Sequence, residues 1–138
     1  MPLEICDLMT TNCETLTPET TMEEAVLLST RLKLQQIPVV EGGRLVGIVT
    51  DRDIKRASPS VWSGAGQDAY DRVLKETTVA QIMTRDPVTV SPDAPIQTAI
   101  RLFCARRFGA LPVVEGGALV GIITPIELLR AYLVHLDR

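Results

Sequence analysis

The strongest constraint on the fold of this chain is an internal repeat. The segment Val39–Thr50, VVEGGRLVGIVT, recurs as Val113–Thr124, VVEGGALVGIIT. When the chain is shifted by 74 positions, residues 9–56 align with residues 83–130 without a gap, and 18 of the 48 aligned residues are identical. A repeat of this quality indicates that one structural unit is used twice in the chain.

The repeat also sets the predicted domain organisation. A unit of about 50–60 residues buries little surface alone, so we expect the two copies to share a core around a pseudo-two-fold axis. We predict a first repeat over residues 1–57, a linker over residues 58–76 and a second repeat over residues 77–138. Ser58–Gly66 is rich in Ser, Gly and Pro, which is typical of linkers. Trp62, within it, is expected to cover an apolar patch, with contact to a partner as the alternative.

Each copy has the pattern strand, helix, strand, strand, helix. In the first copy, the extended piece Glu14–Leu16 precedes a helix whose capping-box signature begins at Thr20 or Thr21. Two short β-branched strands follow, joined by Gly42-Gly43, which suits a two-residue hairpin turn. Because a helix joins the first two strands of each copy, we predict that these strands are parallel.

Three further positions carry structural expectations. Gly47 and Gly121 lie inside predicted strands, where glycine costs stability unless another segment approaches the backbone closely. Pro95 is predicted at the first position of a helix, where its missing N–H costs nothing.

The composition excludes several classes of partner. The net charge is −3 and the isoelectric point about 5.1, so no positive field favours nucleic acid or an anionic membrane surface. The N-terminus lacks the pattern of a signal peptide, and no apolar stretch approaches the length of a membrane span. The three cysteines are odd in number and show no paired spacing, which favours reduced thiols in a cytoplasmic protein.

The sequence also argues against an enzyme. The single histidine, His135, lies near the C-terminus, and no nucleophile is placed beside it by the sequence pattern. Neither a phosphate-binding GxxxxGK nor a dinucleotide-binding GxGxxG is present. Cys6 and Cys13 lack further ligands that would form a metal site, so no metal and no cofactor is expected.

The ordered motifs resemble a known family. The pattern MT…(T/S)P…A…(I/L)PVVEGGxLVGI(V/I)T occurs twice, and the first copy closes with TDRD. This order resembles the cystathionine-β-synthase (CBS) domain, and two in tandem resemble the Bateman module of small bacterial acetoin-utilisation-type proteins. The resemblance implies an α/β fold of the α+β type, in which two pseudo-symmetric β-α-β-β-α repeats pack sheet to sheet as one CBS pair.

The resemblance also implies two ligand clefts between the repeats. In the family, Thr/Ser-x-x-Asp at the start of the last helix grips a ribose, and the other repeat supplies the adenine wall. The first cleft then comprises Thr50, Arg52, Asp53, Met83, Thr84, Asp86, Pro87, Val88, Gly109, Ala110 and Leu111. A purely structural interpretation remains open, in which Thr50 only caps the helix and Asp53 is a first-turn acid.

The second cleft departs from the family pattern and is expected to be weaker or empty. Glu127 stands where the first cleft has Asp53, and Cys13-Glu14 stands where it has Pro87-Val88. The residues of this cleft are Thr10, Cys13, Glu14, Gln36, Ile37, Thr124 and Glu127.

The resemblance therefore implies a regulatory protein rather than an enzyme. The expected ligand is AMP, ADP, ATP or S-adenosylmethionine, bound between the repeats, with the signal passing through a conformational or dimer change to a separate effector protein. Such pairs usually form homodimeric discs. The alternative is a ligand-free module that only dimerises or docks a partner protein.

Overall fold

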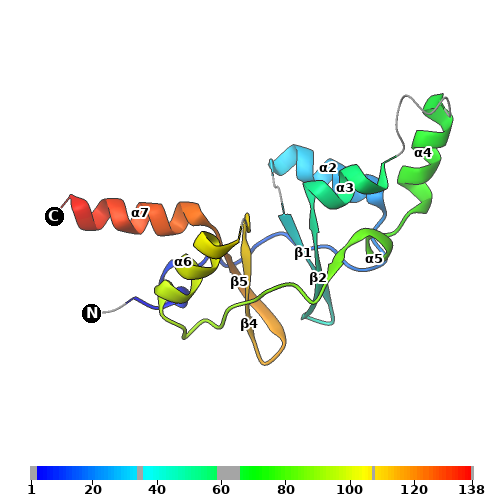
Figure 1. Ribbon diagram of the computed structural model, residues 1–138. Coiled ribbons are helices and arrows are strands. Elements are labelled where there is room, and N and C mark those ends of the chain that lie inside the picture. Colours follow the sequence, from blue (N-terminus) through cyan, green and yellow to red (C-terminus); the bar gives the residue numbers. More distant parts are fainter. Residues whose placement is uncertain (1–2, 34–35, 59–65, 107, 138) are drawn as a thin grey trace. The chain divides into compact units, whose positions relative to one another are not determined.

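The chain divides into two compact units in the computed structural model, which describes residues 3–33, 36–58, 66–106 and 108–137 (Figure 1). Unit 1 contains the chain up to Cys13, Gly43–Leu45 and the chain from Pro87 onward. Unit 2 contains Glu14–Gly42 and Val46–Asp86. Each unit thus takes most of its residues from one repeat and the leading segment from the other. The leading segment of the first repeat ends at Cys13 and belongs to unit 1, and that of the second repeat, residues 77–86, belongs to unit 2. Trp62 lies outside the described residues.

The described residues of unit 2 form three strands and four helices. β2 pairs with β1, and it pairs antiparallel with the short β3. Helix α4 contacts α2, and α5 contacts α3. The elements are α2 (Met22–Leu32), β1 (Gln36–Glu41), β2 (Arg44–Thr50, in this unit from Val46), α3 (Asp51–Ala57), α4 (Gly66–Glu76), α5 (Val79–Ile82) and β3 (Thr84–Arg85).

Unit 1 is built around an antiparallel hairpin. Its strands pair Leu111 with Ile123 and Val113 with Gly121, with a bulge between Val113 and Val114. Figure 1 shows this hairpin with the long C-terminal helix following it. The elements are α1 (Ile5–Leu8), α6 (Ile96–Ala105), β4 (Leu111–Glu115), β5 (Ala118–Ile123) and α7 (Pro125–Leu136).

The predicted parallel pairing is confirmed in both units. Leu16 bridges Val39 in parallel, and Val90 bridges Val113 in parallel. Each bridge is held by two backbone hydrogen bonds: in unit 2 the Leu16 N–H donates to the Pro38 carbonyl at 2.9 Å, and the Val40 N–H donates to the Leu16 carbonyl at 2.8 Å. The helix that separates these strands in sequence provides the crossover that parallel strands require.

The helix starts follow the sequence signals with one exception. The Thr21 hydroxyl caps α2 by accepting from the Glu24 N–H at 3.2 Å, and Pro125 is the first residue of α7. The placement of Pro95 at the first helical position was wrong. Its ψ of 150° is extended, so Pro95 is the N-cap and α6 begins at Ile96. Proline fixes φ but leaves ψ open, which allows either position.

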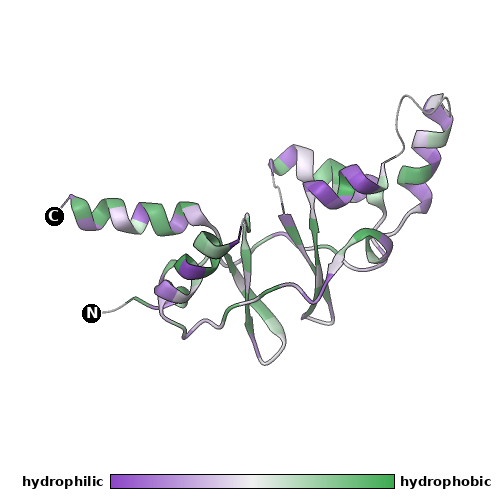
Figure 2. Ribbon diagram, in the orientation of Figure 1, coloured by the Kyte–Doolittle hydropathy of each residue, from purple (hydrophilic) through white to green (hydrophobic). Residues whose placement is uncertain are grey.

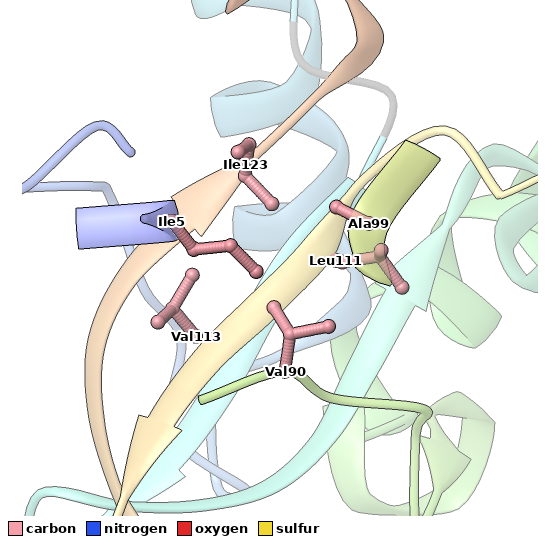
Figure 3. Packing of buried hydrophobic residues seen from close by; sticks show 6 residues of the cluster. All are labelled: Ile5, Val90, Ala99, Leu111, Val113 and Ile123. Carbon is pink, nitrogen blue, oxygen red and sulfur yellow. The ribbon is translucent and has the colours of Figure 1, made fainter. Parts of the chain in front are cut away.

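Each unit has its own aliphatic core. The core of unit 1 is shown in Figure 3 and consists of Ile5, Val90, Ala99, Leu111, Val113 and Ile123. The core of unit 2 consists of Leu16, Ala25, Ile37, Val39, Val49 and Val79. Ile5 and Val79 are equivalent in the repeat, and both are 0% exposed. Each therefore anchors a leading segment in a core built mainly from the other repeat.

The expected close approach to the two strand glycines is confirmed. A Cβ atom added at Gly47 would lie 2.6 Å from Met83 Sδ and 2.9 Å from the Thr84 carbonyl oxygen. At Gly121 it would lie 2.7 Å from Met9 Sδ and 3.0 Å from the Thr10 carbonyl oxygen. Because both Met-Thr segments lie directly on a glycine, no larger residue fits under them without moving backbone.

We expect Gly47→Ala to lower the free energy of unfolding by about 1–3 kcal/mol, because the added methyl group overpacks the contact with Met83 and Thr84. Chemical denaturation of the purified variant measures this change. Arg85→Ala is the control, since Arg85 is exposed and pairs with Gly47 across β2 and β3; surface changes of this kind stay within about 0.5 kcal/mol. Equal stability of Gly47→Ala and the wild type would contradict the prediction.

Candidate functional site: two threonine-bound carboxylates

Asp53 is the buried acid of unit 2. Its side chain is 4% exposed, and it occupies the third position of α3. Thr50 and Asp53 form a reciprocal capping box: the Asp53 N–H donates to Thr50 Oγ1 at 3.1 Å, and the Thr50 N–H donates to Asp53 Oδ2 at 2.9 Å. The local sequence Thr-x-x-Asp thus produces both the start of the helix and the fixed position of the carboxylate.

A second threonine reaches the same carboxylate from a distant part of the chain. The Thr84 hydroxyl donates to Asp53, lying 3.1 Å from Oδ1 and 3.2 Å from Oδ2. Thr84 is on β3, where it is paired with Ile48 of β2. The sequence placed Thr84 in the first cleft but did not predict this bond. The signal was present, since both repeats keep a threonine after methionine and an acid at the third position of the last helix.

Unit 1 contains the equivalent arrangement around Glu127. The Thr10 hydroxyl donates to Glu127 Oε1 at 2.9 Å, and the Thr124 N–H donates to Oε2 at 2.9 Å. The Thr124 hydroxyl also donates to Oε2. Thr10 is held against β5 by two backbone hydrogen bonds with Ile122, at 2.9 and 3.0 Å. The structure therefore joins three predicted residues of the second cleft, as it joins Thr50, Asp53 and Thr84 of the first.

The pKa of Glu127 is lowered from its ordinary value. Partial burial of the carboxyl group raises the pKa, but hydrogen bonds from the Thr124 side chain, the Glu127 backbone, the Thr10 hydroxyl and the Thr124 backbone lower it and outweigh the burial. The charged form of Glu127 is thus the form that unit 1 stabilises.

Three other residues of the first cleft belong to unit 2. Arg52 is exposed on the first turn of α3, and Met83 is half-buried against Gly47. Asp86 is exposed and has a positive φ of 49°, as does its repeat equivalent Asn12, with φ of 55°. Asn and Asp tolerate this left-handed conformation better than most residues, so both Met-Thr segments end in the same kind of bend.

The remaining residues of the first cleft belong to unit 1. Pro87 and Gly109 are half-buried, and Val88 is 37% exposed. Ala110 and Leu111, in contrast, are 7% and 0% exposed. Leu111 packs in the core shown in Figure 3, so its side chain is committed to the interior of the unit.

The other residues of the second cleft are divided in the same way. Cys13 lies in unit 1, whereas Glu14, Gln36 and Ile37 lie in unit 2. Glu14 is exposed and Gln36 is half-buried at the start of β1. Ile37 is 1% exposed and packs in the core of unit 2, as Leu111 does in unit 1.

Within the described ranges, no group of three or more His, Cys, Asp or Glu side chains is arranged to hold a metal ion. None of the helices in that part of the chain has the length and apolar character needed to cross a bilayer.

Comparison with protein families identifies the class. The CBS domain model matches residues 5–60 and again residues 79–134. This chain belongs to the CBS domain family, and it contains two such domains in tandem.

Individual proteins are similar to this chain over most of its length. The CBS domain-containing protein YhcV of Bacillus subtilis is 33% identical over 85% of this chain and 76% of its own length. The structure of AcuB from Vibrio cholerae has a TM-score of 0.82 and 28% identity, covering 99% of this chain and 95% of that one. CBSX2 of Arabidopsis thaliana has a TM-score of 0.86 and 27% identity, covering 100% and 99%. CBSX2 in complex with AMP has a TM-score of 0.80 and 28% identity, covering 98% of each chain.

We expect Glu127→Gln to flatten the pH dependence of stability in acid. Because the pKa of Glu127 is lower in the folded protein, the unfolded state binds more protons as the pH falls below the ordinary glutamate value of about 4.3. The stabilisation by Glu127 is therefore complete above that pH and is lost as the pH falls through the folded pKa. Urea unfolding of the wild type and Glu127→Gln across this range measures the effect, and identical slopes would contradict it.

Proposed function

We propose that this chain binds an adenosine-containing ligand, of the AMP, ADP, ATP or S-adenosylmethionine type, through Asp53. The observation that carries the proposal is the buried Asp53 carboxylate, which Thr50 and Thr84 hold in a fixed orientation. Hydrogen bonds to a charged carboxylate are stronger than those between neutral groups. A carboxylate fixed in this way is suited to accept hydrogen bonds from sugar hydroxyls.

The comparison with CBSX2 supports the same ligand class. That protein has been crystallised in complex with AMP, and it matches this chain over 98% of both lengths. Arg52, exposed on the first turn of α3, offers a positive charge to a phosphate group. No cofactor is needed for this function.

We further propose that the protein is regulatory rather than catalytic. The predicted ligand residues are divided between the units, with Asp53 in unit 2 and Pro87-Val88 in unit 1. A ligand favours the conformation of the protein to which it binds best, and it shifts the population only by that difference in affinity. The signal would then pass to a separate effector protein.

The proposal is tested by calorimetric titration of the purified protein with AMP, ADP, ATP and S-adenosylmethionine. We expect binding of at least one of them, and we expect Asp53→Asn to weaken it by about 1–3 kcal/mol because hydrogen bonds to the charged carboxylate are lost. Asparagine keeps one oxygen to accept from the Thr50 N–H, so α3 retains its cap.

Glu127→Gln is the matched control, because Glu127 is the equivalent acid in the other unit. It is expected to leave the affinity unchanged. If the folded wild type binds none of these ligands, the proposed function is wrong. If Asp53→Asn binds as tightly as the wild type, the assignment of Asp53 is wrong.

A second candidate function is assembly, and it is favoured by the surface of α7. Figure 2 shows apolar residues along this helix. Ile126, Leu129, Leu133 and Leu136 are 52–62% exposed, and their 3-4-3 spacing is that of a helix-packing seam. Such a stripe is well suited to pack against the same helix of a second copy, which would make the protein a homodimer.

We expect Leu133→Glu to reduce self-association, because a charge in a buried apolar seam is costly. Arg130→Glu is the control, since Arg130 is exposed on the same helix but is not one of the four apolar residues. Sedimentation velocity of the two variants and the wild type measures the oligomeric state. A wild type that is monomeric at high concentration would exclude homodimeric assembly.

A further inference from the structure

We propose that Met83 and Met9 are sites of reversible oxidation by peroxides. A sulfoxide at Met83 releases the neighbouring Thr84 hydroxyl from the Asp53 carboxylate, to which it donates in the reduced protein. This inference does not depend on a bound ligand, so its test is separate from that of the proposed function.

The sulfur atom of Met83 lies directly on the backbone of strand β2. A Cβ atom added at Gly47 would lie 2.6 Å from Met83 Sδ and 2.9 Å from the Thr84 carbonyl oxygen. One glycine thus supports both the sulfur and the threonine that binds Asp53. Because Met83 and Thr84 are adjacent in the chain, a displacement of the sulfur acts directly on Thr84.

Exposure separates the two methionines from Met22. Within the described residues, Met83 and Met9 are half-buried, whereas Met22 is 0% exposed. A peroxide must reach the sulfur before it can react, so the sulfur of Met22 becomes available only when unit 2 opens. Met22 is therefore an internal control for Met83 in the same unit.

The oxidation is balanced by the peroxide alone. A lone pair of the thioether sulfur attacks one oxygen of hydrogen peroxide, the O–O bond breaks, and a sulfoxide forms while water leaves. The sulfur loses two electrons and the peroxide gains them. Methionine sulfoxide reductases reverse the change, with one enzyme for each sulfoxide epimer.

The sulfoxide is polar and larger than the thioether that it replaces. Met83 packs against the apolar core of unit 2, and its sulfur has no spare room above Gly47. The oxidised side chain is therefore more stable in water than packed on the strand. Thr84 is exposed and β3 contains only two residues, so few contacts hold this segment once the methionine leaves.

Met9 in unit 1 has the same relation to its strand glycine. A Cβ atom added at Gly121 would lie 2.7 Å from Met9 Sδ and 3.0 Å from the Thr10 carbonyl oxygen. The Thr10 hydroxyl in turn donates to Glu127. Both units thus place an oxidisable sulfur beside the threonine that binds the acid.

The modification is tested by treating the folded protein with hydrogen peroxide and mapping its peptides by mass spectrometry. Dithiothreitol, added afterwards, reduces oxidised cysteine and leaves methionine sulfoxide in place. We expect Met83 and Met9 to be oxidised at least about tenfold faster than Met22, because a buried sulfur reacts only after opening. Equal protection of Met83 and Met22 overturns the proposed site.

The release of Thr84 is tested in Met9→Leu, in which unit 1 has lost its oxidisable sulfur at nearly constant volume. Hydrogen exchange is measured on the peptide that contains residues 83–85, since β3 pairs with β2. We expect peroxide to speed this exchange at least about threefold and the reductases to restore it. Strand β1 should keep its exchange rate, because the opening is local.

The double variant Met9→Leu/Met83→Leu is the matched control, because it keeps Met22 and all three cysteines. Peroxide should leave its exchange unchanged. An unchanged rate in oxidised Met9→Leu, or the same acceleration in the double variant, overturns the release of Thr84. An equal acceleration of β1 also overturns it, because the whole unit has then lost stability.

Discussion

The structure depends on one steric requirement: the strand residue that contacts each Met-Thr segment must have no side chain. Gly47 and Gly121 have no side chain, and the carbonyl oxygens of Thr84 and Thr10 occupy the space that a Cβ atom would need. This contact brings each threonine hydroxyl to the acid at the start of the following helix. Glycine is a poor strand residue, but here its lack of a side chain permits the packing that also brings the threonine hydroxyl to the carboxylate.

The two units share one backbone arrangement but give their acids, Asp53 and Glu127, different hydrogen-bond environments. Both units place two threonines on one carboxylate, and both bury an aliphatic residue of the leading segment completely. The change from Asp53 to Glu127 alters the hydrogen bonding without altering the backbone plan. At this position the copies differ in the side chain of the acid, whereas both keep the contact of the Met-Thr segment with the strand glycine.

Much of this architecture was predictable because it is encoded locally. Short-range patterns predict the repeat, the Gly42-Gly43 turn and the cap at Thr50. Gly47 inside β2 also indicates that another segment lies close to the backbone there. The identity of the approaching segment was harder to predict, because Thr84 and Asp53 are 31 positions apart and the only signal that links them is that both repeats keep the Met-Thr pair and an acid at the third position of the last helix. Leu111, one of the residues predicted for the first cleft, packs in the core of unit 1, and a single sequence does not separate these two roles.

The exchange of leading segments determines whether one repeat, cut from the chain, could form a complete unit. A fragment that contains one repeat carries the segment that completes the other unit, so it lacks the residue that fills its own core and the threonine that satisfies its own acid. The repeats are consequently not separable building blocks, although the sequence makes them look so. Two separate copies of one repeat would each be able to supply the leading segment that the other lacks. A tandem duplication would then place both segments on one polypeptide.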